Sequence, residues 1–183
     1  MKQWEFLLSG SGGQGLVLAG LILAEGAVKA GKNVIQTQTY GPEARGGASR
    51  AEVIISDGEI DYPKVVRPDL LLAMSQEAYD KYAPLAKRSN ALVLIDQEFV
   101  TEPSDQEDNL VALPLTKAAA ERIGKALVAN MVALGALMAF TRVFSPQLLE
   151  AALLDRVPAG SEELNLKAFR LGLEMAGEIR GRK

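Results

Sequence analysis

A glycine-rich turn between an apolar strand and an apolar helix constrains the fold of this chain most. Residues 4–9 have the pattern of a short buried strand, and residues 16–30 that of a helix, with Gly31 placed to cap its end. The turn between them reads Gly10-Ser11-Gly12-Gly13-Gln14-Gly15. A strand, a tight turn and a helix in this order point several backbone N–H groups and the positive end of the helix dipole at one spot. Such a spot suits an anion, usually a phosphate.

The glycine spacing also fits the G-x-G-x-x-G pattern of dinucleotide-binding sites. Such a site needs an acidic residue about twenty positions further on, at the end of the second strand, to hold a ribose hydroxyl. Here the second strand, residues 33–38, ends in Gln36-Thr37-Gln38-Thr39 and carries no carboxylate. This argues against an ordinary NAD enzyme. A second interpretation is that the glycines only let the helix pack closely on the sheet.

The composition excludes several kinds of chemistry. The length of 183 residues suits one domain, residues 1–183. The net charge of -3 gives no indication of a basic face that would bind nucleic acid. The sequence contains no cysteine and no histidine. It therefore offers no thiolate nucleophile, no imidazole base and no cysteine ligands for a cluster or zinc. We expect no catalytic residue and no metal site in this chain, so that any redox metal lies in another chain.

Two uncharged runs raise the question of a membrane span. The first, Leu7 to Ala24, contains many glycines with Ser9, Ser11 and Gln14 among them, and the second, residues 126–141, is shorter. A span needs about 20 mainly apolar residues. Both runs therefore favour buried elements of a cytoplasmic protein.

A second glycine-rich stretch follows the second strand. Residues 39–49 show neither helical nor strand periodicity, and they contain five residues that we single out: Tyr40, Glu43, Arg45, Gly46 and Gly47. A dinucleotide fold would place a helix here, but this loop leads directly into another strand, residues 50–55. A loop of about ten residues in a compact domain is usually functional or disordered. Its charged residues among glycines favour function over a solvated surface loop.

The remaining chain alternates strands with helices. Apolar runs predict strands at 70–74, 91–96 and 110–114, and periodicity and capping predict helices at 76–86, 117–123, 126–144, 147–154 and from 161 onward. We expect an α/β, three-layer Rossmann-like domain with a mostly parallel sheet and one antiparallel strand, residues 50–55. Asn130, in a mostly apolar helix, more often satisfies a neighbouring backbone group than a ligand. The carboxyl ends of the strands, with both glycine loops, form the expected working edge.

The two glycine stretches together resemble the gamma subunit of the 2-oxoacid:ferredoxin oxidoreductases. The likeness extends to Ser49 with Glu52, to Pro68-Asp69, and to Asn130 and Gly135, so that it covers nearly the whole chain. Within that family, the length and the isolated subunit look most like the 2-oxoglutarate enzyme. Pyruvate, branched-chain 2-oxoacid and indolepyruvate enzymes have similar subunits or domains.

The resemblance implies a share in oxidative decarboxylation. A 2-oxoacid and coenzyme A become an acyl-coenzyme A and carbon dioxide, and the electrons pass to ferredoxin. Thiamine diphosphate, its magnesium ion and the iron–sulfur clusters are then held by other subunits. The expected partners are the alpha, beta and ferredoxin-like subunits of the same enzyme, and the isolated chain has apolar surfaces through which it can form a homodimer.

The resemblance also suggests roles for the two loops. The N–H groups of Gly12, Gly13, Gln14 and Gly15 are placed to receive a phosphate, for example of coenzyme A. Arg45 suits a phosphate, a substrate carboxylate or an acidic residue of a neighbouring subunit, with Glu43 positioning it and Tyr40 stacking nearby. Two other interpretations stay open. The loops are an assembly surface without a ligand, or the chain is a free-standing nucleotide-binding protein.

Overall fold

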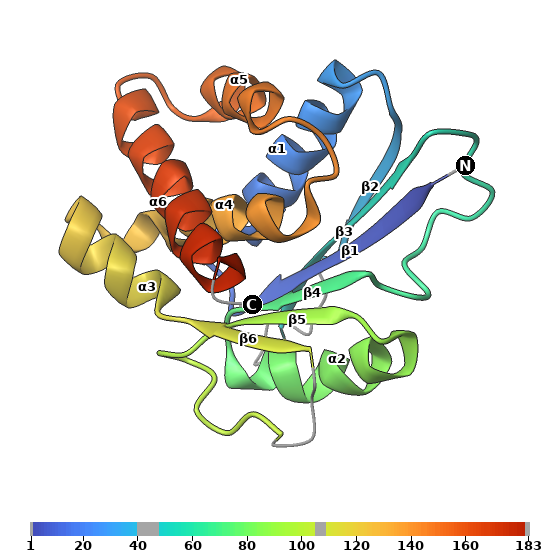
Figure 1. Ribbon diagram of the computed structural model, residues 1–183, viewed down its shortest axis with the longest axis horizontal. Coiled ribbons are helices and arrows are strands. Elements are labelled where there is room, and N and C mark those ends of the chain that lie inside the picture. Colours follow the sequence, from blue (N-terminus) through green and yellow to red (C-terminus); the bar gives the residue numbers. More distant parts are fainter. Residues whose placement is uncertain (1, 40–47, 105–108, 182–183) are drawn as a thin grey trace.

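The computed structural model describes residues 2–39, 48–104 and 109–181. These residues form a sheet with the strand order β2-β3-β1-β4-β5-β6 (Figure 1). The strands are β1 (Gln3–Gly10), β2 (Asn33–Thr39), β3 (Ser49–Ser56), β4 (Leu70–Ala73), β5 (Leu92–Asp96) and β6 (Leu110–Leu113). Strand β1 therefore lies inside the sheet, where its end carries the glycine turn.

Strand β3 runs antiparallel to both of its neighbours, β1 and β2, whereas β4, β5 and β6 continue parallel to β1. This confirms the expected mostly parallel sheet with one antiparallel strand. A parallel neighbour needs a crossover of a dozen or more residues, usually containing a helix. The connection from Thr39 to Ser49 is too short for that, so the chain turns back on itself.

Helices cover both faces of the sheet and complete the expected three layers. Helices α1, α4, α5 and α6 lie on one side and α2 on the other (Figure 1). Their bounds are α1 (Leu16–Lys29), α2 (Gln76–Ser89), α3 (Leu115–Ala118), α4 (Ala129–Thr141), α5 (Pro146–Arg156) and α6 (Glu162–Arg180). None of the helices in the described ranges is both long and apolar enough to cross a membrane.

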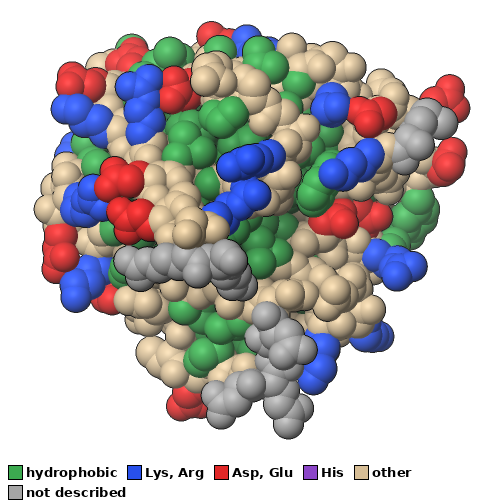
Figure 2. Space-filling view, in the orientation of Figure 1, with side chains coloured by type: hydrophobic (Ala, Val, Ile, Leu, Met, Phe, Trp, Pro, Cys, Tyr) green, Lys and Arg blue, Asp and Glu red, His purple; other side chains and the backbone are tan. Residues whose placement is uncertain are grey.

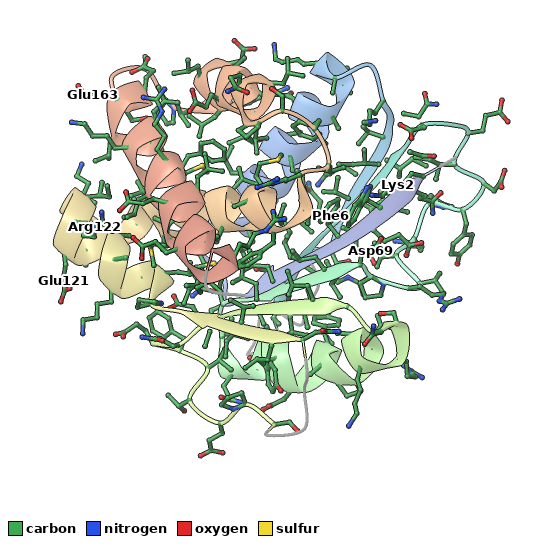
Figure 3. All side chains as sticks on the ribbon, in the orientation of Figure 1. Lys2, Phe6, Asp69, Glu121, Arg122 and Glu163 are labelled. Atoms are coloured by element: carbon green, nitrogen blue, oxygen red, sulfur yellow. The ribbon has the colours of Figure 1, made fainter. Side chains whose placement is uncertain are left out.

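The apolar run of β1 reflects burial on both faces of the sheet. Phe6 and Leu8 belong to the core beneath α1 and α4, and Figure 3 shows Phe6 on that side of the strand. Leu7, between them in sequence, packs in the second core with Tyr79 and Tyr82 of α2. Because successive side chains of a strand point to opposite faces, both faces must be apolar here.

Two glycines allow α4 and α6 to pack with their backbones in contact. A Cβ added at Gly135 would collide with the carbonyl oxygen of Phe169, and one added at Gly172 would collide with that of Val132. Each helix therefore presents a glycine where the backbone of the other passes. The contact fixes α6 against α4, and α4 in turn reaches the glycine turn.

Two predicted helices differ from the structure. The predicted helix 117–123 is instead α3, which begins after Pro114, followed by a π-helical segment, Ala119–Ile123. The hydroxyl of Thr116 donates to the buried carboxylate of Asp96 rather than capping its own helix. The predicted helix 126–144 begins with a 3-10 turn, Ala126–Val128, and α4 ends at Thr141. These differences follow from tertiary contacts that local periodicity does not record.

Candidate functional site

The glycine turn adopts a backbone that only glycine adopts without strain. Gly13 has φ +88°, and Gly15, the residue before α1, has φ +72°. Positive φ angles of this size disfavour any residue with a Cβ. The turn therefore requires glycine at these two positions for conformational reasons, before any ligand is considered.

The side chain of Gln14 holds the turn against the neighbouring strand. Its Oε1 accepts a hydrogen bond from the N–H of Ser11 at 2.7 Å, and its Nε2 donates to the carbonyl oxygen of Met74 at 2.8 Å. A Cβ at Gly10 would overlap with this side chain. The Gln14 amide thus links the end of β1 to the end of β4, a structural role that the sequence did not reveal.

The outer part of the turn is open. Nothing lies within 4 Å of the Cβ positions of Gly12 and Gly13, and both residues are exposed. Among the described residues, no acceptor binds their backbone N–H groups. Helix α1 also has no acidic residue in its first turn and no side-chain cap. The free N–H groups and the helix dipole therefore favour an anion at this place, and the glycines leave room for it.

Asn130 fixes the inner part of the turn from α4. Its Nδ2 donates to the carbonyl oxygen of Gly15 at 3.1 Å, and its Oδ1 accepts from the N–H of Met131 at 3.0 Å. A Cβ at Gly15 would collide with this side chain. The prediction that Asn130 satisfies a backbone group is confirmed, and the group that it satisfies belongs to the candidate site.

A largely apolar pocket of about 260 Å³ adjoins the turn. Gly13, Gln14 and Met74 form one side of it, and the other lining residues are Phe99, Thr116, Ala126, Leu127 and Ala129. Phe99 is 48% exposed and Leu127 78% exposed, although both are large and apolar. Sequence reasoning missed these two residues, because Phe99 lies outside any predicted element and Leu127 is one of many apolar residues in the predicted helix 126–144.

The buried carboxylate of Asp96 orders one wall of this pocket. It lies at the end of β5 and accepts hydrogen bonds from the N–H of Thr116 at 3.1 Å and from that of Glu98 at 3.3 Å. Its backbone carbonyl accepts from the N–H of Phe99 at 3.1 Å. Burial raises the pKa of the Asp96 carboxyl, while these hydrogen bonds act in the opposite direction. One side chain thus fixes both Thr116 and the turn that carries Phe99.

Residues 40–47 of the second glycine stretch lie outside the described residues, and with them the predicted site residues Tyr40, Glu43, Arg45, Gly46 and Gly47. The strand that follows it starts beside the first turn. Ser49 is paired with Gly10, and its hydroxyl donates to the Gly10 carbonyl oxygen at 3.0 Å. In return, the Ser9 hydroxyl donates to the carbonyl oxygen of Ser49 at 2.9 Å. The strand register therefore brings the chain into and out of the second loop at the edge that carries the first.

No cluster of three or more His, Cys, Asp or Glu side chains suited to a metal ion occurs in residues 2–39, 48–104 and 109–181. The site that the structure builds consists of backbone N–H groups, an apolar pocket and one buried carboxylate. Such an arrangement is suited to binding and orienting a ligand.

The sequence profile of the pyruvate ferredoxin/flavodoxin oxidoreductase family matches residues 5–175. A 2-oxoglutarate synthase subunit KorC from Methanocaldococcus jannaschii is 49% identical over 178 residues, which are 96% of this chain and 95% of that protein.

Two solved structures are similar. The gamma subunit of a keto/oxoacid ferredoxin oxidoreductase from Geobacter sulfurreducens has a TM-score of 0.85 at 46% identity, covering 94% of this chain and 98% of that one. A 2-oxoglutarate:ferredoxin oxidoreductase from Magnetococcus marinus, with 2-oxoglutarate, coenzyme A and succinyl-CoA bound, also has a TM-score of 0.85, at 25% identity, covering 97% of this chain and 32% of that one.

The matches extend over nearly the whole chain in sequence and in structure, and they confirm the resemblance to the gamma subunit. The chain belongs to the pyruvate ferredoxin/flavodoxin oxidoreductase family.

Proposed function

We propose that this chain is the gamma subunit of a multi-subunit 2-oxoglutarate:ferredoxin oxidoreductase. The enzyme would convert 2-oxoglutarate and coenzyme A to succinyl-CoA and carbon dioxide and pass the electrons to ferredoxin. The observation that carries the proposal is the 49% identity to a 2-oxoglutarate synthase subunit along 96% of the chain. The match extends over nearly the whole chain rather than being confined to one motif.

In this proposal the bond-making groups belong to other subunits. The sequence has no cysteine to ligate an iron–sulfur cluster and no Gly-Asp-Gly motif for the magnesium ion of thiamine diphosphate. The alpha, beta and ferredoxin-like subunits would hold these cofactors. The gamma chain then contributes to assembly and to binding a part of the substrate that does not react.

We assign that binding role to the glycine turn and propose that it receives a phosphate of coenzyme A. The free N–H groups of Gly12 and Gly13 and the start of α1 would contact the phosphate oxygens. The adjoining pocket between Gly13 and Leu127 offers apolar surface to the arm of the coenzyme. Coenzyme A supplies the thiol that accepts the acyl group, and this chain's residues would hold and orient the molecule.

A second candidate role for the same edge is packing against a catalytic subunit. The exposed side chains of Phe99 and Leu127 favour it, because large apolar side chains that stand in solvent often become buried in an interface. The two roles are compatible, since a coenzyme bound between subunits would contact both. A free-standing dinucleotide-binding protein is less well supported, since β2 ends in Gln38 and Thr39 with no carboxylate for a ribose.

Gly12→Leu in the assembled enzyme tests the coenzyme A assignment. Gly12 has no positive φ, and nothing lies within 4 Å of its Cβ position, so the fold accepts a side chain there. We expect the KM for coenzyme A to rise about tenfold or more, because a leucine would occupy the place of the phosphate. The KM for 2-oxoglutarate and the Tm of the isolated chain should stay unchanged.

The outcomes separate the roles. An unchanged KM for coenzyme A, with the variant chain incorporated into the enzyme, would remove the turn from coenzyme binding. Failure of the variant chain to join the enzyme would favour the assembly role. A large Tm increase of the isolated wild-type chain on adding NAD or a flavin would instead support the free-standing nucleotide-binding protein.

A further inference from the structure

A second concave surface lies at the carboxyl ends of α4 and α6, away from the glycine turn. It is a groove of about 610 Å³ whose lining includes the apolar residues Met138, Phe144 and Leu173 and the basic residues Arg142 and Arg180. Helix α4 contacts the glycine turn through Asn130 at its start, and Arg142 follows its last residue, so the groove lies about 18 Å further along the helix. The groove is therefore separate from the candidate coenzyme site.

The groove is positively charged without an acidic counterpart. None of its lining residues is acidic, and among the described residues neither arginine makes an ion pair. Arg180 donates a hydrogen bond to the carbonyl oxygen of Ala139 in the last turn of α4, which accounts for its position. Among residues 2–39, 48–104 and 109–181, no hydrogen bond or ion pair is made by the guanidinium of Arg142. In Figure 2, basic and hydrophobic side chains lie side by side over the middle of the molecule, where Figure 1 places the ends of these helices.

The backbone at Arg142 makes this arginine unusual. It caps α4 in the left-handed region, with φ 48°, a conformation that costs an ordinary residue about 1–2 kcal/mol. At the end of α2 the chain places Asn90 in the same conformation, and asparagine tolerates it well. The fold of α4 would be better served by glycine or asparagine. An unpaired arginine at a strained position fits a role of its side chain toward something outside this chain.

Gly177 gives an independent indication that something approaches the groove. It lies in α6, where glycine is less favourable than alanine by about 1 kcal/mol. Gly135 and Gly172 are explained by the opposing helix backbone, but nothing lies within 4 Å of the Cβ position of Gly177. The fold does not require this glycine. A glycine that faces an open groove keeps the helix backbone accessible to a close neighbour.

We propose that this groove is a docking site for an acidic, partly apolar segment of another subunit of the same enzyme. Carboxylates of that segment would pair with Arg142 and Arg180, and its apolar side chains would pack on Phe144 and Leu173 beside Gly177. The choice of partner rests on the proposed function, which makes this chain one subunit of a larger enzyme. The positive charge of the groove favours a negatively charged partner, and its apolar lining favours a segment that also carries hydrophobic residues.

Competitive assembly tests the proposal in the complete enzyme. Wild-type and variant chains with different tags are expressed at equal levels together with the other subunits, and their ratio in the purified enzyme is measured by mass spectrometry. We expect Arg142→Glu and Gly177→Leu each to be depleted about tenfold or more relative to wild type. Both isolated variants should keep the wild-type Tm to within a few degrees, since neither side chain is needed by the fold.

Lys87→Glu is the matched control. Lys87 also lies in the last turn of a helix, α2, but on the opposite side of the sheet. The Lys87→Glu chain should therefore enter the enzyme to the same extent as the wild-type chain. Equal incorporation of Arg142→Glu and Gly177→Leu would overturn the groove as a docking site while leaving the proposed function intact. A homodimer of the isolated wild-type chain that both variants abolish would overturn the choice of partner. If wild type joins no such enzyme, the proposed function fails first.

Discussion

Three glycines in α4 and α6 should respond in opposite ways to the same substitution. Gly135→Ala and Gly172→Ala place a methyl group into the backbone of the opposing helix, whereas Gly177→Ala places it in open space. All three are helical positions, where alanine is favoured over glycine by about 1 kcal/mol. The sign of each change therefore depends on the tertiary contact alone.

The magnitudes follow from what the new Cβ meets. At Gly135 it would overlap with the Phe169 carbonyl oxygen and lie 3.0 Å from the N–H nitrogen of Leu173. Helix backbone cannot rotate away as a flexible side chain does, so α4 and α6 must separate. Overpacking of this kind costs about 1–3 kcal/mol or more, and contact with rigid helix backbone puts these two positions at or above the upper end of that range. The gain in helix propensity from glycine to alanine, about 1 kcal/mol, offsets part of this cost. We expect a net loss of about 2–3 kcal/mol at Gly135 or Gly172 and a gain of about 0.5–1 kcal/mol at Gly177.

Urea unfolding of the isolated chain, followed by circular dichroism, measures these changes directly. For a chain of this size the two destabilised variants should lose roughly 5–10 °C in Tm. The m-value should stay constant, which assigns the effect to the native packing. If Gly135→Ala lies within measurement error of wild type, or Gly177→Ala is as unstable as Gly135→Ala, the packing argument and the inference drawn from Gly177 both fail.

Three further predictions concern the site. Asn130→Ala should lose about 2 kcal/mol in urea unfolding, because it removes the bond to the Gly15 carbonyl and leaves a buried N–H without a partner, and it should also raise the KM for coenzyme A. Asp96→Asn should make the free energy of unfolding depend less on pH. Burial raises the pKa of the Asp96 carboxyl in the folded chain, so this group favours folding below its pKa in the unfolded chain, about 3.9, and loses that contribution as the pH rises through its pKa in the folded chain. Urea unfolding from pH 3 to 7 checks this, and a variant that falls further behind wild type as pH rises would contradict it. Leu127→Lys and Phe99→Ser should leave the Tm of the isolated chain within about 2 °C of wild type, because Leu127 is largely exposed and Phe99 about half exposed, but should impair activity of the assembled enzyme. Wild-type activity in both would remove the pocket edge from the functional surface.

Local sequence patterns predicted most of the fold because burial leaves a direct record in them. Strands β1, β4 and β5 are covered on both faces, so they read as continuous apolar runs. The short stretch without helical periodicity after residue 39 of the sequence predicted that β3 turns back against its neighbours. The predicted start of the helix 76–86 is confirmed, and the residue before it, Ser75, caps it by accepting a hydrogen bond from the N–H of Ala78.

Features of the site that depend on contacts between distant segments were not predictable in this way. The bond from Gln14 to the Met74 carbonyl requires that β1 and β4 be neighbours, which the order of residues does not state. The pocket beside the turn combines segments around Gly13, Phe99 and Leu127, each unremarked by itself. Asn130 was anticipated as a residue that satisfies a backbone group, but the identity of that group, the Gly15 carbonyl, came from the structure.

We propose that this chain is a working subunit of a 2-oxoglutarate:ferredoxin oxidoreductase. The most direct measurement is 2-oxoglutarate-dependent reduction of a viologen dye, in the presence of coenzyme A, by the enzyme purified through a tag on this chain. We predict that thiamine diphosphate-binding and iron–sulfur subunits are recovered with it, that activity requires coenzyme A, and that 2-oxoglutarate is preferred over pyruvate. Recovery of the chain alone, or of an active enzyme that prefers another 2-oxoacid, would contradict this account.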